Sequence, residues 1–101
     1  MNAEEMKKWA FQNAKFVKLE DGDSVVAKFV DCRSIPSRFD REKNVMEYKL
    51  ELEDGSVKFW EQGSTSVANK MAEFHGKTVE IKRVGEGTST QYEISLADEI
   101  V

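Results

Sequence analysis

The sequence of 101 residues predicts a single domain built mainly from β-strands, with one helix between the third and fourth strands of a small barrel. Three observations lead to this prediction. Apolar and polar residues alternate along several short stretches, as they do in half-buried strands. Asp-Gly pairs at 21–22 and 54–55 indicate tight turns, because glycine accepts the positive φ that such turns need. A stretch with helical spacing, from about Ser64 to Phe74, separates two of the strands.

The first 15 residues are expected to form an N-terminal arm or a short helix, and residues 16–101 the barrel domain. Met6, Trp9 and Ala10 have helical spacing, so a short helix could lay Trp9 against the body. A partly frayed arm is the alternative, because chain termini are often poorly ordered unless they are tied down.

Two strands are expected before a long loop. The first is short and covers Phe16–Leu19, and the second covers Ser24–Arg33 and is apolar on both faces. We expect the second strand to bend, so that each half joins a different part of the barrel. The loop from Ser34 to Asn44 is long for a small domain, and loops of this length are usually functional or mobile.

A hairpin follows, with strands at Val45–Leu52 and Ser56–Trp60. On the first strand, Leu50 and Leu52 are expected to point into the core. The residues that then face outward are Glu47, Lys49 and Glu51.

On the returning strand of the hairpin, Val57 and Phe59 are expected to point inward. This orientation would turn Lys58 and Trp60 outward. The other core aromatic residues are expected to be Phe29, Tyr48 and Tyr92.

The helix carries a narrow apolar stripe of Val67, Met71 and Phe74, which indicates that it plugs one end of the barrel. Two strands complete the chain, at Lys77–Val84 and Gln91–Leu96, and a glycine-containing hairpin loop joins them.

Composition narrows the classes of function. Charged residues make up 34% of the chain and hydrophobic residues 40%, as in an ordinary globular domain. No stretch approaches the roughly 18 consecutive apolar residues of a membrane span. The first residues lack the features of a signal peptide, and the single cysteine cannot form an internal disulfide. We therefore expect a cytoplasmic protein without a membrane partner.

The net charge of −4 disfavours indiscriminate binding of nucleic acid, but two segments are locally basic. Residues 33–43 hold four basic against two acidic side chains, and residues 77–83 hold three against one. Because charges act over about 8–10 Å at moderate salt, the distribution of charge matters more than its sum.

Catalytic chemistry has little support in the sequence. One histidine and one cysteine cannot form a zinc site of Cys and His ligands. Cys32 and His75 are a conceivable nucleophile pair, but Cys32 lies in an apolar strand and His75 at a helix end. The glycines at 85 and 87 lie between strands, where they do not fit a phosphate-binding loop. We expect no enzyme, no metal, no cofactor and no small-molecule substrate.

Nucleic-acid binding has more support. An outward Trp60 beside Lys49 and Lys58 suits base stacking, which is worth about 1–3 kcal/mol per base. The alternative is that the N-terminal segment or a second subunit covers Trp60. Phe39, which lies among arginines of the long loop, is a second stacking candidate, unless it anchors the loop on the barrel.

The predicted nucleic-acid-binding residues combine these aromatic side chains with nearby cations. They are Arg33, Arg38, Phe39, Lys43, Lys49, Lys58, Trp60, Lys82 and Arg83. The outward carboxylates Glu47 and Glu51 count against this surface, because they would repel phosphate.

The order of elements from Phe16 to Leu96 resembles the OB-fold, a five-stranded Greek-key barrel with a helix between strands 3 and 4. The resemblance rests on this order and on the long, interrupted first strand, and not on a diagnostic motif. Within that class the chain looks like the compact single-stranded-DNA-binding proteins of phages, archaea and archaeal viruses.

The resemblance implies binding of single-stranded DNA or RNA with little sequence preference, and a role in DNA replication. It also implies a cytoplasmic location, in the host if the protein is viral. The alternative is a protein-interaction or assembly module without a nucleic-acid role, such as a homo-oligomer that buries Trp9 and Trp60 at a subunit interface.

Overall fold

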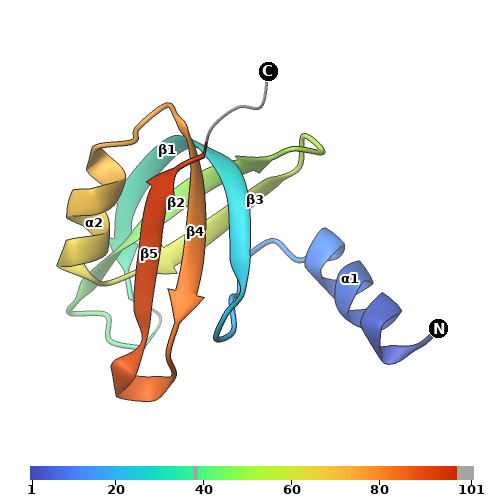
Figure 1. The fold of residues 1–101 in the computed structure, drawn as a ribbon. Coiled ribbons are helices and arrows are strands. Elements are labelled where there is room, and N and C mark those ends of the chain that lie inside the picture. Colours follow the sequence, from blue (N-terminus) through green and yellow to red (C-terminus); the bar gives the residue numbers. More distant parts are fainter. Residues whose placement is uncertain (38, 98–101) are drawn as a thin grey trace.

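A five-stranded antiparallel sheet with two helices forms the protein (Figure 1). The computed structural model describes residues 1–37 and 39–97, without the side chain of Gln12. In chain order the elements are α1 (Ala3–Asn13), β1 (Ser24–Pro36), β2 (Asn44–Leu52), β3 (Val57–Gln62), α2 (Thr65–Ala72), β4 (Thr78–Val84), the 3₁₀ turn η1 (Gly87–Ser89) and β5 (Gln91–Leu96). The strands lie side by side in the order β3-β2-β1-β4-β5.

The long strand β1 bends, as the sequence predicts. Its pairing with β2 shifts register between Phe29 and Asp31, which marks an irregularity of the β-bulge type. The residues before the shift pair with β4, and most of those that pair with β2 follow it. The expected loop is shorter than predicted, because β1 continues to Pro36 and only residues 37–43 connect it to β2.

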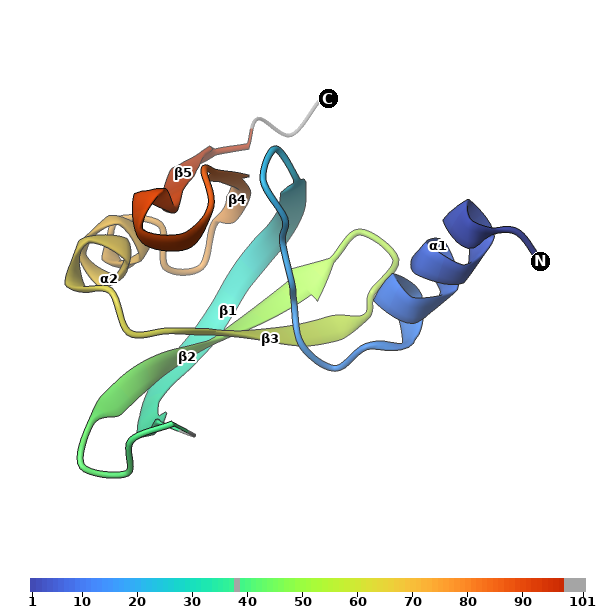
Figure 2. The same ribbon diagram turned by 90° about the horizontal axis from the view of Figure 1, so that it is seen from below.

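The sheet curves toward a barrel without closing. Strands β3 and β5 are the two edges of the sheet, and no backbone ladder joins them in the described part of the chain. Side chains bridge the gap instead, because the rings of Trp60 and Tyr92 lie 5.1 Å apart between centroids. The amide nitrogen Nε2 of Gln62 also donates to the Tyr92 hydroxyl at 3.5 Å. Figure 2 shows β4, β5 and α2 on one side of the open sheet, and β3 on the other.

Aromatic side chains fill the centre of the core. Trp60, Tyr48 and Phe29 are each at most 2% exposed. Their rings follow one another at centroid distances of 5.5 Å, between Trp60 and Tyr48 and again between Tyr48 and Phe29. His75 packs edge-on against Phe29 at 5.0 Å. The core positions predicted for Phe29 and Tyr48 are therefore confirmed, and Tyr92 packs half-buried against the same core.

The predicted orientation of β3 is wrong, because Lys58 and Trp60 are each 2% exposed and point inward. The physical cause is the turn. Gly55 adopts φ +84, and Leu52 donates its N–H to Ser56 O at 2.9 Å, so the loop between the paired residues holds three residues. A shift of one residue in a hairpin moves every side chain of the strand to the other face.

The register places Lys58 opposite Leu50 and Trp60 opposite Tyr48, on the core face. Phe59 lies opposite Lys49 on the outer face. The orientation predicted for β2 is confirmed for Leu50, which is buried, and for Lys49 and Glu51, which are exposed. Glu47 was expected to face outward and is instead buried, at 8% exposure.

The segment Phe16–Leu19 was expected to be a strand, and this expectation is wrong. It makes one isolated parallel bridge, between Phe16 and Phe59. Backbone hydrogen bonds of 2.9 Å join Val17 N–H to Phe59 O and Phe59 N–H to Lys15 O. Val17 and Leu19 are buried, so the segment alternates like a strand although it lacks a continuous partner.

Of the two alternatives for the first 15 residues, the described structure has the short helix, but it does not lay Trp9 against the body, because Trp9 is 59% exposed. The helix α1 precedes the sheet and stands away from it on the side opposite α2 (Figures 1 and 2). The helix α2 begins after Ser64, whose hydroxyl accepts from Val67 N–H at 3.3 Å. Its apolar stripe reaches the core through Val67 and Met71, which are buried.

The turn that fixes the register predicts a specific order of stabilities for Gly55 variants. Alanine at Gly55 should cost about 1–2 kcal/mol, because a residue with a Cβ is strained at positive φ. A Cβ there would meet nothing within 4 Å, so the cost is confined to the backbone. Asparagine tolerates the left-handed conformation, so Gly55→Asn should cost less than Gly55→Ala. Urea denaturation measures both, and equal costs for the two variants would contradict this assignment of the turn.

Because the Tyr48 phenol is buried, we expect the folded state to lose stability at alkaline pH. Burial raises the pKa of the Tyr48 phenol above its ordinary value of 10.0, and the charge of the nearby Cys32 thiolate raises it further. The folded state then holds the proton more tightly than the unfolded state, so the stabilisation is complete below pH 10 and is lost as pH rises toward the folded pKa.

The variant Tyr48→Phe isolates this effect. The Tyr48 hydroxyl is buried and has no hydrogen-bond partner among the described residues, so its removal at pH 7 should change stability by less than about 1 kcal/mol. Denaturation measured from pH 8 to above pH 10 should show a smaller alkaline loss for the variant than for wild type. Identical pH profiles would contradict the assignment to Tyr48.

Candidate nucleic-acid interface

Two predicted site residues lie in the interior. Trp60 packs between Tyr48 and Tyr92, where it cannot stack on a base, and neither the N-terminal segment nor a second subunit is needed to cover it. Truncation of a core tryptophan costs about 3–5 kcal/mol, so a Trp60→Ala variant reports on folding and not on binding. Lys58 is likewise unable to meet a phosphate on the outer face.

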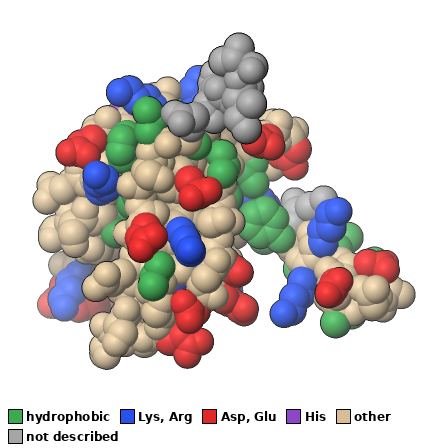
Figure 3. Space-filling model, in the orientation of Figure 1, with side chains coloured by type: hydrophobic (Ala, Val, Ile, Leu, Met, Phe, Trp, Pro, Cys, Tyr) green, Lys and Arg blue, Asp and Glu red, His purple; other side chains and the backbone are tan. Residues whose placement is uncertain are grey.

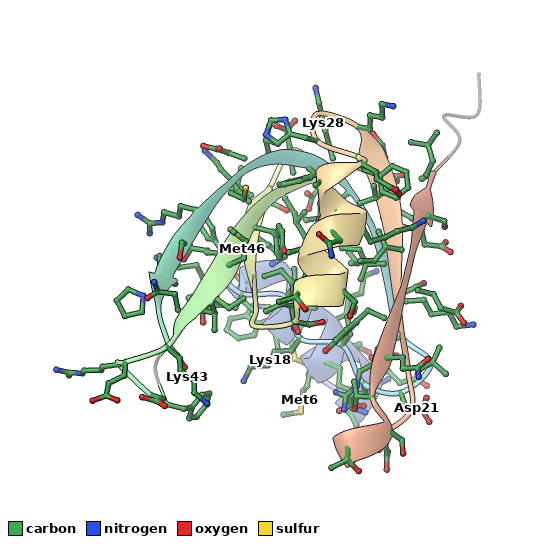
Figure 4. All side chains as sticks on the ribbon, turned by 90° about the vertical axis from the view of Figure 1, so that its left-hand side faces the viewer. Met6, Lys18, Asp21, Lys28, Lys43 and Met46 are labelled. Carbon is green, nitrogen blue, oxygen red and sulfur yellow. The ribbon has the colours of Figure 1, made fainter. Side chains whose placement is uncertain are left out.

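The loop between β1 and β2 carries the remaining predicted aromatic residue. Phe39 is 100% exposed, so the alternative in which it anchors the loop is wrong. Arg41 and Lys43 are exposed on the same loop, and Lys43 lies well away from Lys18 (Figure 4). Arg38 lies outside the described residues.

Two predicted cations already have partners within the protein. Arg33 donates from Nε to Glu47 Oε1 at 2.8 Å, which neutralises the carboxylate that counted against the outer face. Arg83 donates to Leu19 O at 2.7 Å and to the Thr90 hydroxyl at 3.3 Å, so it ties two loops to β4.

Lys82 is exposed on β4, opposite Ser24 of β1 and Glu93 of β5. It lies on the half of the sheet formed by β1, β4 and β5, whereas Lys49 lies on the half formed by β1, β2 and β3. The structure therefore does not bring Lys82 together with Lys49.

Aromatic and basic side chains meet instead on the outer face of β3. Phe59 lies between Lys49 of β2 and Phe16 of the preceding segment, and paired neighbours in a sheet present their side chains on one face. The Lys15 ammonium stands 5.8 Å from the Phe16 ring centroid and 5.6 Å from that of Phe59. Both rings are half-buried, and both lysines are exposed. We call these four residues the Phe–Lys row.

A cleft of about 740 Å³ continues from the Phe–Lys row toward the N-terminus. It lies between α1 and the segment that leads into β1, and we call it the α1 cleft. Its cations are Lys7, Lys8, Lys15 and Lys18, and its apolar lining comes from Ala10, Phe11, Ala14 and Phe16. Two carboxylates, Glu20 and Asp23, lie at its other end. In Figure 3, α1 stands out from the body as a lobe that carries basic side chains.

A second cleft, of about 530 Å³, lies between α2 and β5 and differs in charge. Lys70 is the charged residue of its described lining, and its ammonium pairs with Glu73 at 3.4 Å. Of the two clefts, the α1 cleft therefore holds more of the cations that could meet an anionic polymer.

The buried Lys58 anchors α1 to the sheet. Its ammonium donates to the backbone oxygens of Phe11 and Ala14, the latter at 2.5 Å, and stands 5.0 Å from the Phe11 ring centroid. The last carbonyls of a helix have no partner within it and carry partial negative charge, so a cation satisfies them. Lys58 thus holds the C-terminal end of α1 beside β3.

Sequence reasoning missed the lysines of the N-terminal segment. The available signal was the interleaving of lysines with aromatic residues over positions 7–18, which is typical of surfaces that bind single strands. The contribution of Phe59 was missed for a different reason, because the predicted register turned it inward.

Comparison with known proteins adds no relative: no family model, no curated protein and no solved structure matches this chain. Across residues 1–37 and 39–97, no helix has the length and apolar character needed to cross a membrane. The same residues form no cluster of three or more His, Cys, Asp or Glu side chains that could hold a metal ion.

The anchoring role of Lys58 predicts a local effect of Lys58→Met. Methionine keeps an unbranched apolar side chain but loses the ammonium, so α1 should detach while the sheet stays folded. Hydrogen exchange of the α1 amides should accelerate by about tenfold or more, because an isolated helix of 11 residues is marginally stable in water.

The matched control is Lys49→Met, which makes the same substitution on the outer face of the same hairpin. It should leave exchange in α1 unchanged. Equal exchange rates in α1 for wild type and Lys58→Met would show that other contacts hold the helix.

Proposed function

We propose that this protein binds single-stranded nucleic acid, with DNA as the expected form, along the Phe–Lys row and the adjoining α1 cleft. The observation that carries the proposal is the meeting of Phe16 and Phe59 with Lys15 and Lys49 on one outer face. Aromatic rings offer base stacking that tolerates any sequence, and lysines neutralise the phosphates beside it.

The distribution of charge supports this path over the one predicted from the sequence. Five of the 15 lysines and arginines belong to the row or the cleft. The central outer face of β2 is less favourable, because Glu51 is exposed there and Asp31 lies opposite Lys49. A nucleic-acid strand that runs along the β3 edge toward α1 would move away from these carboxylates.

The proposed function fits an interpretation of the sheet as a partly open OB-type barrel. The strand order β3-β2-β1-β4-β5 and the position of α2 between β3 and β4 in the chain support this interpretation. The side-chain bridge from Trp60 to Tyr92 stands where a closed barrel would have backbone pairing. The outer face of strands 2 and 3 carries the ligand in many barrels of this type.

The binding test uses a fluorescent dT oligonucleotide of about 12 nucleotides, a length within the range for one such domain. The double variant Lys15→Ala/Lys49→Ala should weaken binding by roughly tenfold and lower the log–log salt slope by about 1.4, since each phosphate contact contributes about 0.7. Fluorescence anisotropy at several salt concentrations measures both quantities.

The control is Lys28→Ala/Lys77→Ala, which removes the same charge from two exposed lysines that belong neither to the Phe–Lys row nor to the lining of the α1 cleft. Figure 4 shows Lys28 well away from Lys18. The control should bind like wild type apart from a small general effect of net charge. Equal weakening by the two double variants, or binding that ignores salt, would contradict the proposed site.

A second candidate function is assembly through α1. Met6 is 57% and Trp9 59% exposed, and they share the helix face that points away from the α1 cleft. Exposed aromatic residues of this kind favour a protein interface. Light scattering on the eluting protein, with and without the oligonucleotide, separates the two functions: an oligomer that Trp9→Ala dissociates, and that ignores DNA, favours assembly.

A further inference from the structure

We propose that α1 acts as a clamp, closing over a nucleic-acid strand in the α1 cleft and holding its phosphates from the side opposite the sheet. This inference rests on the proposed function and concerns how the same site retains its ligand. It assigns a binding role to Lys7 and Lys8, which lie on the helix, and a positioning role to Lys58.

The two walls of the cleft carry complementary groups for one kind of ligand. Lys7 and Lys8 come from α1, while Lys15 and Lys18 come from the segment that follows it. Between them, Phe11 and Phe16 supply apolar surface for a base. A nucleotide strand presents both a flat apolar base and a phosphate in each repeat, which matches lysines placed around phenylalanines.

The two carboxylates of the α1 cleft limit the path that a bound nucleic-acid strand can take. Asp23 accepts from Glu20 N–H at 3.0 Å, so this side chain is engaged in the turn before β1. Glu20 and Asp23 would repel phosphate at their end of the cleft. The backbone is therefore expected to pass between Lys7 and Lys8 on one wall and Lys15 on the other, and to leave toward Phe59.

Both ends of α1 are capped, although none of its described side chains is buried. The Asn2 side chain caps its start by accepting from Glu5 N–H at 2.8 Å, and Glu4 and Glu5 lie in its first turn. Lys58 satisfies its last carbonyls. Each described side chain of α1 is nevertheless exposed, so little buried surface resists its movement.

These features together make α1 a capped helix whose described attachment to the sheet runs through Lys58. The attachment lies at the C-terminal end of the helix, close to Lys15 and the Phe–Lys row. A nucleic-acid strand bound in the α1 cleft would contact both α1 and the segment that follows it, and would therefore restrict movement of the helix away from the sheet. Loss of the attachment should then weaken binding even though Lys58 itself touches no ligand.

The test compares four proteins with the same labelled dT oligonucleotide: wild type, Lys7→Ala/Lys8→Ala, Lys58→Met and the control Lys28→Ala/Lys77→Ala. Removing the two helix lysines should weaken binding by roughly tenfold and lower the salt slope by about 1.4. Lys58→Met should weaken binding by about threefold or more without a comparable fall in the salt slope. The substitution loosens the attachment of α1 but removes no phosphate contact.

Hydrogen exchange provides the readout that tests closure. The oligonucleotide should slow exchange of the α1 amides in wild type by about fivefold, and should protect them less in Lys58→Met. A wild-type complex with unprotected α1 amides, or full affinity in Lys7→Ala/Lys8→Ala, would overturn the clamp.

The outcomes distinguish the clamp from the proposed function. If wild type binds and Lys15→Ala/Lys49→Ala weakens it, while the helix variants bind like the control, the site stands and the clamp is wrong. If wild type does not bind the oligonucleotide at any salt concentration, the proposed function is wrong and the clamp falls with it.

Discussion

The short turn between β2 and β3 imposes the constraint on which the rest of the structure depends. With Gly55 at positive φ, Leu52 pairs across the loop with Ser56, and this register fixes the face of every later residue in β3. Trp60 then completes the aromatic core and reaches Tyr92 of β5 across the open side of the sheet. Lys58 enters from the same face and holds α1, while Phe59 takes the outer position.

Local patterns predicted most of the elements because each depends on neighbours in sequence. The strands at β2, β4 and β5, the helix α2 and the bend of β1 follow from alternation, helical spacing and an apolar run too long for one face. The register of β3 was not predictable in this way. Apolar residues occupy both odd and even positions of β3, namely Val57, Phe59 and Trp60. The pattern of β3 therefore does not determine which face points inward, and the turn determines it instead.

The candidate site was predicted only in part for the same reason. Lys49 and Phe39 are exposed as expected, because each prediction rested on a strand or loop whose orientation was correct. Lys58 and Trp60 exchanged faces with Phe59, so the outer aromatic residue was misassigned by one position. The role of the lysines of α1 and the following segment depends on tertiary structure. The contact that holds α1 beside the sheet joins Lys58 to the carbonyl of Ala14, which is 44 residues away in the sequence.

The resulting molecule separates its charges although its net charge is −4. Lysines gather around α1 and the β3 edge, and Arg33 neutralises the buried carboxylate of Glu47. Backbone amide chemical shifts, followed by NMR during titration with oligo(dT), test this account most directly. The largest changes should fall on residues 7–18, on Lys49 and on Phe59. Changes centred on β4 and β5, or confined to the loop at residues 37–43, would contradict it.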